Sequence, residues 1–252
     1  MVDISVIIQA RMGSTRLPGK VLKDISGRPV LWHVINRIKK SKYISKIIVA
    51  TTDNKEDIKI YEYCNKNNIN VFRGSSEDVL DRYYKCAKEY DCKNIVRITA
   101  DCPLHDALVI DKVVESYLEK KYDYVSNTFK YTYPDGLDTE IFSFNVLKDA
   151  WENAKLLSER EHVTPYIRKN SKYRKSNILA DKKYPVYRLT LDYDEDYNFI
   201  KSIYKGIGKL DFSLDDVIEF LNKNLELLRL NGNYKINEGY EKSLKEDKIV
   251  KF

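Results

Sequence analysis

The stretch from Gln9 to Lys20 carries residue types suited to holding phosphate groups. It directly follows an apolar run and contains two glycines, two hydroxyl residues, two arginines and a lysine. Glycine lets backbone N–H groups turn toward a bound anion, and runs of such groups form anion-binding nests. Arginine and lysine add positive charge that suits phosphate oxygens. We therefore interpret this stretch as a cradle for a polyphosphate.

The spacing of the glycines separates this stretch from the commonest phosphate loops. Five residues rather than four lie between Gly13 and Gly19, and Val21 stands where a Walker A loop has Ser or Thr. The stretch does not match GxGxxG either. The stretch is therefore a different kind of phosphate-binding loop, with more cationic side chains than these two. The residues that we expect to contact a nucleotide here are Gln9, Ala10, Arg11, Gly13, Ser14, Arg16 and Lys20.

Two aspartates are placed to hold a divalent cation beside this cradle. Asp101 follows a strand-like run at 94–99, and Asp192 follows another at 187–191. Mg²⁺ prefers carboxylate oxygens together with substrate phosphates, so we predict both aspartates as its ligands. A turn or helix-capping role is the alternative for Asp101. Asp192 also begins a DxD sequence with Asp194, the metal motif of many nucleotide-sugar glycosyltransferases, so a rival function stays open.

An acidic stretch at 135–140 interrupts the regular pattern of the chain and combines a turn with three carboxylates. Long irregular insertions in compact folds tend to carry function, so these groups would accept hydrogen bonds from sugar hydroxyls. Polar positions of a hairpin are the alternative. His162 would contact the same ligand or lie on a helix surface. The residues that we expect to bind an acceptor are Asp135, Gly136, Asp138, Glu140, His162 and Arg188.

The elements that must position these residues alternate over the first 127 residues. Strand-like runs lie at 4–8, 47–50, 70–72, 95–99 and 122–126, with helical patterns at 29–40, 54–67, 78–90 and 106–120. Strands separated by helices form right-handed βαβ units and a mostly parallel sheet. Ligands bind beyond the carboxyl ends of such strands, where the loops 11–20, 51–53, 73–76 and 100–104 lie. Asp53 with Glu56 is expected to cap the second helix.

After residue 127 the alternation ends. The stretch 129–144 predicts a hairpin or a long loop, and helices are expected at 144–154 and 158–168, the second opened by a Ser158–Glu161 capping box. A strand at 187–191 precedes helices at 194–205 and 213–228, the last capped by Ser213. We predict a single domain over residues 1–240 with a lid-like insertion at about 128–185, followed by a loosely held charged tail at 241–252.

The composition excludes several classes of protein. Hydrophobic residues are 43% of the 252 residues, which supports a real core, and no apolar run reaches the ~18 residues of a membrane span. The net charge of +6 is spread along the chain, so a lysine-rich surface explains it better than nucleic-acid binding. The four cysteines lack metal-binding spacing, and no signal peptide is visible, so we expect a cytoplasmic protein without nucleic-acid or membrane partners.

Six segments, in this order along the chain, resemble the cytidylyltransferases that activate acidic sugars, and within them the spore coat polysaccharide biosynthesis protein F group. They are Ile8–Lys20, Arg73–Tyr83, Thr99–Leu104, Asp135–Glu140, Ser158–Tyr166 and Leu191–Asp196, and the resemblance covers roughly residues 3–205. It implies an α/β nucleotide-diphospho-sugar transferase (Rossmann-like) fold, often dimeric. It also implies the use of CTP and Mg²⁺ to make a CMP-sugar and pyrophosphate.

The resemblance also assigns roles to residues. The chain is similar to 3-deoxy-manno-octulosonate cytidylyltransferases, in which the positions matching Arg11 and Lys20 hold the triphosphate and those matching Asp101 and Asp192 hold magnesium. These four are the expected catalytic residues. The members of the family build the rim of the nucleotide site at positions that match Arg73, Asp78 and Arg82.

Two departures from that branch bear on the ligands. Gln9 replaces its usual proline, and Tyr193-Asp194 replaces Thr-Pro after the second aspartate, while both metal aspartates remain. The expected reaction is transfer of CMP from CTP to a sugar acid or related sugar, for a surface polysaccharide or glycan. The alternatives are a GT-A-type glycosyltransferase, a nucleotidyltransferase with another base or a sugar-phosphate acceptor, and a non-catalytic nucleotide- or RNA-binding protein.

Overall fold

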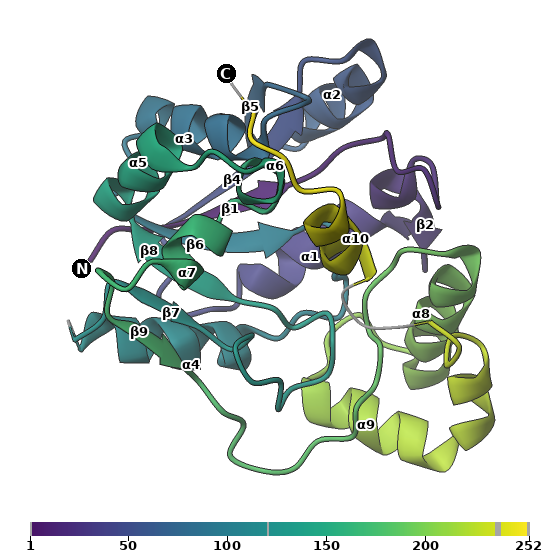
Figure 1. The fold of residues 1–252 in the computed structure, drawn as a ribbon. Helices are drawn as coiled ribbons and strands as arrows, with labels where there is room; N and C mark the ends of the chain where they lie inside the picture. Colours follow the sequence, from purple (N-terminus) through teal and green to yellow (C-terminus); the bar gives the residue numbers. More distant parts are fainter. Residues whose placement is uncertain (1, 120, 235–237, 251–252) are drawn as a thin grey trace.

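A seven-stranded mixed sheet forms the centre of the computed structural model, which describes residues 2–119, 121–234 and 238–250 (Figure 1). The strand order is β5 (Asn70–Gly74), β4 (Lys46–Thr52), β1 (Ile4–Gln9), β6 (Asn94–Thr99), β8 (Glu140–Ser143), β7 (Tyr124–Ser126) and β9 (Lys175–Asn177). β1 pairs in parallel with both of its neighbours, whereas β8 runs antiparallel to both of its own. The predicted α/β fold with a mostly parallel mixed sheet is confirmed.

Alternation along the strands sends side chains into two layers of helices. Val6 and Ile8 face the layer of α1 (Val30–Ile38), α2 (Ile58–Lys66) and α4 (Ala107–Leu118). Ile7 faces the layer of α3 (Val79–Glu89), α5 (Phe144–Asn153) and α7 (Pro165–Lys169). Successive strand residues point to opposite faces. All three side chains are fully buried, and each such burial stabilises the fold by about 1.5–3 kcal/mol.

A third apolar cluster combines α8 (Asp194–Ile207) and α9 (Leu214–Lys223) with the extended segment 187–191. Leu191 packs there, and its N–H group donates to the carbonyl of Asp101 at 2.9 Å. The segment that precedes Asp192 is thereby fixed to the end of β6. Further short elements are β2 (Asp24–Ile25), β3 (Arg28–Pro29) and 3₁₀ turns at Lys20–Leu22, Lys55–Asp57 and Leu225–Arg229.

Several predicted elements differ in detail. Residues 187–191, predicted as a strand, are extended but make an isolated bridge between Arg188 and Asp135. The helix predicted over 158–168 is divided into α6 (Leu157–His162) and α7, because Val163 has a φ of 70° in the left-handed region. The stretch 129–144 is a loop as far as residue 139, followed by β8. No helix in the described part of the chain has the length and apolar character to cross a membrane.

Of the three predicted helix caps, one is confirmed. The Ser213 side chain accepts a hydrogen bond from the Asp216 N–H group at the start of α9. The Ser158–Glu161 box is wrong, because the carboxylate of Glu159 caps α6 instead. The Asp53 cap is also wrong, because the turn at 55–57 precedes α2 and the N-cap residue of α2 is Asp57, whose side chain accepts no capping hydrogen bond from the helix. Lys120, the end of the predicted fourth helix, lies outside the described residues.

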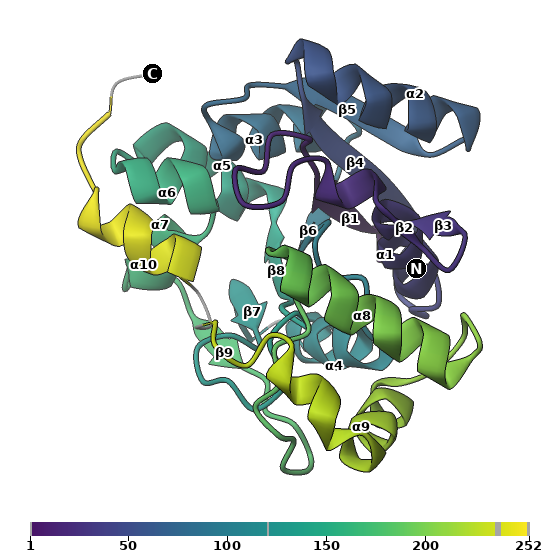
Figure 2. The ribbon, with the colours of Figure 1, turned by 90° about the vertical axis from the view of Figure 1, so that its right-hand side faces the viewer.

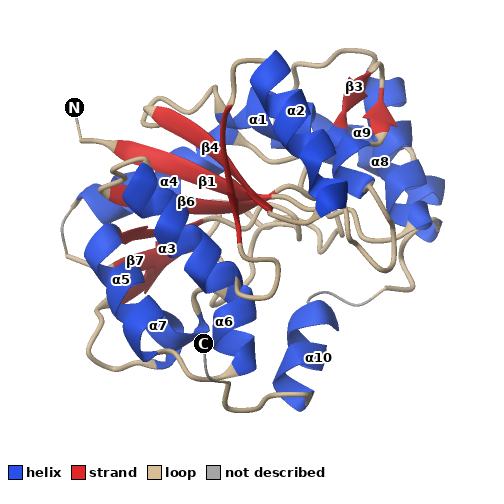
Figure 3. Cartoon of the chain, turned by 90° about the horizontal axis from the view of Figure 1, so that it is seen from above, coloured by secondary structure: helices blue, strands red, loops and turns tan. Residues whose placement is uncertain are grey.

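The C-terminal segment is not the loosely held tail that its charge predicts. Residues Glu238–Lys245 form α10, which packs beside α6 (Figure 3). Beyond α10, the N–H group of Val250 donates to the carbonyl of Lys155 at 2.8 Å. The hydroxyl of Ser158 donates to Asp247 at 2.8 Å. The charged composition of this segment led to a wrong prediction, because the contacts that hold it are made by backbone groups and two short polar side chains. Residues 251 and 252 lie outside the described residues.

Candidate active site

A pocket of about 580 Å³ lies at the carboxyl ends of β1 and β6, and we call it the cationic pocket. Figure 2 shows α6 and α10 on one side of these strand ends and α8 on the other. Six parts of the chain line the cationic pocket. They are residues 9–11, 14–16, 20 and 21; Val79 and Arg82; residues 99–101; Glu161 and His162; Asp192 and Tyr193; and Glu238, Gly239, Lys242, Ser243 and Glu246. The volume suits a small-molecule ligand.

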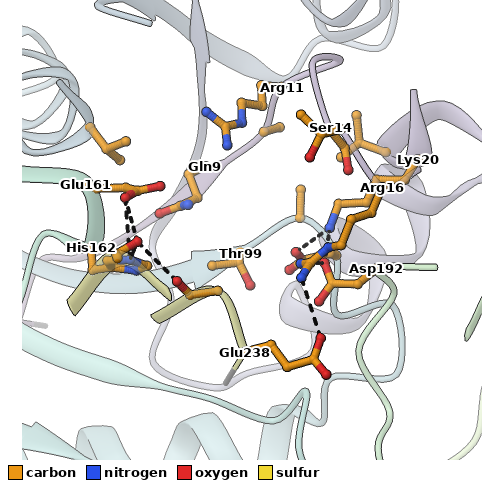
Figure 4. A pocket seen from close by; sticks show the side chains of 18 of the residues that line it. Gln9, Arg11, Ser14, Arg16, Lys20, Thr99, Glu161, His162, Asp192 and Glu238 are labelled. Carbon is orange, nitrogen blue, oxygen red and sulfur yellow. Dashed lines mark hydrogen bonds and ion pairs between the residues drawn. The ribbon is translucent and has the colours of Figure 1, made fainter. Parts of the chain in front are cut away.

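Lys20 joins the two predicted metal aspartates in this pocket, and Figure 4 shows it beside Asp192. Its Nζ lies 2.7 Å from Oδ2 of Asp101 and 2.8 Å from Oδ1 of Asp192, and it donates to the carbonyl of Leu191 at 2.8 Å. Nη2 of Arg16 lies 2.8 Å from the same oxygen of Asp192. Two carboxylates from distant parts of the chain therefore share one ammonium group.

Asp101 and Lys20 keep their charges at neutral pH. Burial alone would raise the pKa of Asp101, but the Lys20 ammonium group and local hydrogen bonds lower it to about 2. Burial would lower the pKa of Lys20, and the two aspartates raise it instead. Among the described residues, no group of three or more His, Cys, Asp or Glu side chains could hold a metal. Two carboxylates fit Mg²⁺ when substrate phosphates complete the ligand set.

Arg188, predicted to bind an acceptor, instead positions Asp192. Its Nη2 lies 3.0 Å from Oδ2 of Asp192, leaving Oδ1 of that residue to Lys20 and Arg16. Asp196 fixes the guanidinium from the other side, with Nε and Nη2 each donating at 3.0 Å. Arg188 does not line the cationic pocket.

Asp135 and Gly136, also predicted to bind an acceptor, support this buried arrangement. Asp135 lies 3.6 Å from the Arg188 guanidinium, and burial raises its pKa to about 6 although Arg188 opposes the rise. Gly136 has a φ of 96°, and a Cβ there would lie 2.7 Å from the backbone of Leu189. Only glycine accommodates that close approach.

Backbone N–H groups of the predicted cradle donate to other groups of the protein. The Met12 N–H group donates to Oδ1 of Asp57 at 2.5 Å, and the N–H groups of Ser14 and Gly19 both donate to the Met12 carbonyl at 2.9 Å. Gly13 does not line the pocket, and a Cβ there would lie 2.7 Å from a Glu56 oxygen. The predicted nest at Gly13 and Ser14 is therefore not formed in this structure, and the loop presents mainly side chains.

Arg11 and Arg82 supply positive charge that the aspartates do not neutralise. Arg11 makes no hydrogen bond or ion pair with another described residue, and it is drawn within the pocket in Figure 4. Arg82 donates from Nη1 to the Ser75 carbonyl at 2.5 Å, but its buried Nε has no hydrogen-bond partner in the part of the chain that the structure describes. Burial lowers the pKa of Arg82, and the nearby charge of Arg11 adds to that effect. An anionic ligand would satisfy both groups.

Arg73 and Asp78, predicted for the nucleotide rim, hold the scaffold instead and do not line the pocket. Arg73 donates to the carbonyls of residues 52, 53 and 54, closing the loop after β4. Asp78 caps α3 and forms a buried ion pair with Arg160 of α6, whose Nε lies 3.0 Å from Oδ2. Asp78 therefore joins two helices that border the site.

A second cavity of about 360 Å³ adjoins the cationic pocket, and we call it the side pocket. The two share Thr99 and His162 as wall residues. Three predicted acceptor residues line it, namely Asp138, Glu140 and His162. The other lining residues are Arg97, Thr128, Phe129, Tyr131, Thr164, Pro165, Arg168 and Tyr240. The structure therefore brings half of the predicted acceptor set together.

The carboxyl groups of the side pocket differ in charge. Glu140 is held ionised, because Arg97 and other partners lower its pKa against the effect of burial, and Nη1 of Arg97 lies 2.5 Å from it. Burial raises the pKa of Asp138 to about 8, helped by the charges of Asp135 and Glu140. Asp138 is therefore largely protonated at neutral pH and can donate a hydrogen bond.

Sequence reasoning missed Arg97, which connects the two pockets by donating from Nη2 to Oε1 of Gln9 at 3.1 Å. A charged residue inside the apolar run 94–99 was the available signal. It also missed α10, because a lysine- and glutamate-rich helix carries no local sign of an active-site role. The DxD alternative is not assembled: the side chain of Asp194 is 71% exposed, pairs with Lys23 and does not line the cationic pocket.

Comparisons with known proteins indicate a cytidylyltransferase. The sequence model described as Cytidylyltransferase matches residues 5–229. The chain is 44% identical over 230 residues to the uncharacterized protein MJ1063 of Methanocaldococcus jannaschii, covering 90% of this chain and 93% of that protein. It is 37% identical over 233 residues to the spore coat polysaccharide biosynthesis protein SpsF of Bacillus subtilis, covering 89% and 96%.

Solved structures share the fold. A cytidylyltransferase from Leptospira borgpetersenii superposes with a TM-score of 0.86 at 36% identity, covering 94% of this chain and 99% of the other. A CMP:2-keto-3-deoxy-manno-octonic acid synthetase solved with CTP superposes with a TM-score of 0.64, covering 81% and 99%. At 15% identity, the second likeness concerns the fold alone.

Proposed function

The chain belongs to the cytidylyltransferase family, and from this premise we propose that it transfers CMP from CTP to a sugar acid and releases pyrophosphate. The observation that supports this most is the sharing of Lys20 by Asp101 and Asp192 in a pocket lined by three arginines. A triphosphate needs many cations, whereas a divalent ion needs carboxylates, and this pocket offers both.

The reaction joins a hydroxyl oxygen of the acceptor to the α-phosphorus of CTP while the bond to pyrophosphate breaks. Arg11, Arg82 and Lys20 would neutralise the phosphate oxygens, because charge stabilisation and positioning dominate transfers of this kind. Asp101 and Asp192 would hold Mg²⁺, which supplies positive charge to the phosphates when it is bound. Arg188 keeps Asp192 oriented for that task.

The side pocket is the acceptor site in this proposal. Arg168 forms no ion pair with a described residue, so a carboxylate of the acceptor would meet a cation there. Three aromatic side chains, Phe129, Tyr131 and Tyr240, offer apolar faces to a sugar ring. The name of the Bacillus relative supports a product destined for surface polysaccharide. The homodimer, the cytoplasmic location and the division at residue 240 stay predictions.

The test is release of pyrophosphate from each of the four nucleoside triphosphates with Mg²⁺ and a panel of sugar acids and sugar phosphates. We expect CTP and a sugar acid to give the product. Asp101→Asn should lower kcat by on the order of 10²-fold, whereas Asp194→Asn, a matched change outside the pocket, should leave kcat unchanged. Release with another nucleotide, or equal loss in both variants, would overturn the proposal.

A further inference from the structure

The junction of the cationic and side pockets carries a hydrogen-bonded trio that the proposed function does not use. Nε2 of His162 lies 2.9 Å from the hydroxyl oxygen of Ser243, and that hydroxyl lies 2.8 Å from Oε2 of Glu161. Figure 4 labels His162 and Glu161 at this junction. Glu161 and His162 come from α6, and Ser243 comes from α10. His162 and Thr99 are the residues that both pockets share.

The partners of Ser243 determine which nitrogen of His162 carries the hydrogen. Besides His162, the hydroxyl has two partners that can only accept, the Glu161 carboxylate and the Gly239 carbonyl at 3.1 Å. The single hydrogen of the hydroxyl must go to one of these acceptors. The imidazole therefore donates through Nε2–H, and Nδ1 keeps its lone pair. Nδ1 has no hydrogen-bond partner among the described residues.

The surroundings keep this imidazole neutral. Burial lowers the pKa of His162 to about 4. The charges of Glu161 and Glu140 oppose this effect, and those of Arg97 and Arg11 add to it. The ring of Tyr240, on α10, meets the imidazole edge to face at 5.0 Å between centroids. Groups from both helices thus hold the ring in one orientation, and burial keeps it neutral.

We propose that Ser243, together with Glu161, is a positioning residue that holds His162 so that Nδ1 receives the proton of the attacking acceptor hydroxyl. This inference rests on the proposed transfer of CMP. The acceptor oxygen and the α-phosphorus must meet where the two pockets join, which is where His162 lies. As the O–P bond forms, the O–H bond breaks, its proton passes to Nδ1, and pyrophosphate leaves with the electron pair of the broken P–O bond.

The hydrogen-bonded chain then offsets part of the cost that burial imposes on the imidazolium. Its Nε2–H group donates to Ser243, which donates to the Glu161 carboxylate, so the new positive charge faces a negative one through one hydroxyl. This places a residue of α10, beyond the 5–229 segment that matches the family, in the machinery of the reaction. α10 is fixed for this role by the contacts of residues 247–250 with α6 and the residues just before it.

Steady-state kinetics with CTP and the active sugar acid test the role. Ser243→Ala should lower kcat about tenfold while the KM for CTP stays unchanged, as for other residues that orient a reacting group. Ser243→Thr, which keeps the hydroxyl, should restore most of kcat. The matched control is Ser202→Ala on α8. The Ser202 hydroxyl, like that of Ser243, lies within hydrogen-bond distance of the carbonyl four residues earlier, but Ser202 lines neither pocket.

A double-mutant cycle separates positioning from mere support of the fold. Adding Ser243→Ala to His162→Gln should produce no further loss of kcat, because Ser243 acts through the imidazole. Additive losses would overturn the inference. So would a Ser243→Ala variant with wild-type kcat.

Nuclear magnetic resonance provides a readout that does not depend on any acceptor. The chain has three histidines, so nitrogen-labelled histidine gives few signals, and His162→Gln assigns the one in question. We expect His162 as the neutral Nε2–H tautomer at pH 6, and a mixture of tautomers in Ser243→Ala. An Nδ1–H tautomer in the wild type would refute the inference and leave the proposed function standing. Absence of any pyrophosphate release, with the expected tautomer present, would refute the proposed function instead.

Discussion

Replacing Lys20 by Met tests the central charge cluster directly. The substitution keeps the length and apolar stem of the side chain but removes the ammonium group that Asp101, Asp192 and the Leu191 carbonyl share. Two carboxylates then face each other without their common partner. We expect a loss of both catalysis and stability, for separate physical reasons.

The size of each effect follows from the structure. The Asp101 pKa falls from an ordinary 3.8 to about 2. This corresponds to about 2 kcal/mol of native-state stability at neutral pH. Because the folded pKa lies below the unfolded one, this stability is present above about pH 4. It is lost as the pH falls toward 2, so wild type and variant should converge in acid. Loss of a cation at the phosphates should lower kcat by on the order of 10²-fold.

The assay combines urea denaturation at pH 7 and pH 3 with pyrophosphate release at saturating CTP. Lys23→Met is the matched control, because Lys23 lies three residues away and pairs with the exposed Asp194 at 3.4 Å. Exposed pairs contribute about 0–1 kcal/mol, so the control should stay close to wild type. A folded Lys20→Met protein with near-normal kcat, or a stability loss no larger than that of the control, would refute the reasoning.

Three further predictions follow from other ionisable groups. Asp78→Ala should destabilise the fold by about 3 kcal/mol or more, because it leaves Arg160 buried without its carboxylate. If the KM for CTP of the folded protein rises instead, Asp78 touches the nucleotide. Asp138→Asn should raise the melting temperature at pH 8 but not at pH 4. The raised pKa of Asp138, about 8, makes wild type lose stability as the pH rises from about 4 to 8; equal melting curves at pH 8 would contradict this. Arg168→Met should raise the KM of the sugar acid and leave that of CTP unchanged, and the reverse pattern would assign Arg168 to the nucleotide.

The order of the first strands and helices followed from local pattern. Nearly continuous apolar runs such as Ile4–Ile8 are typical of strands that are buried on both faces. The helical stretches between these runs favour parallel pairing of the strands. The same reasoning placed Lys20 and Asp101 at one edge of the sheet, since the carboxyl ends of parallel strands lie together. The structure places both in the cationic pocket.

Local pattern failed where it could not show which protein group a charged side chain faces. Asp78, Arg188 and Asp135 carry the charges expected of ligand-binding residues, yet their charges face other protein groups. Arg188 was assigned to an acceptor although Asp192 and Asp196 lie only four and eight residues further on, because that spacing alone does not show that the three side chains meet in a buried cluster. The extended segment 187–191 was predicted as a strand because an apolar alternation looks the same whether or not a neighbouring strand is present.

By itself, the amino-acid sequence determined the alternating α/β order, the cationic loop and the two strand-end aspartates, since each depends on residue types and short spacings. Only the tertiary structure decided which charges remain available to a ligand, how Asp192 is oriented, and that α10 closes the wall beside His162. The physical reason is that pairing between distant charges and the docking of a polar helix depend on how whole elements pack. Neither leaves a periodic signal in the local sequence.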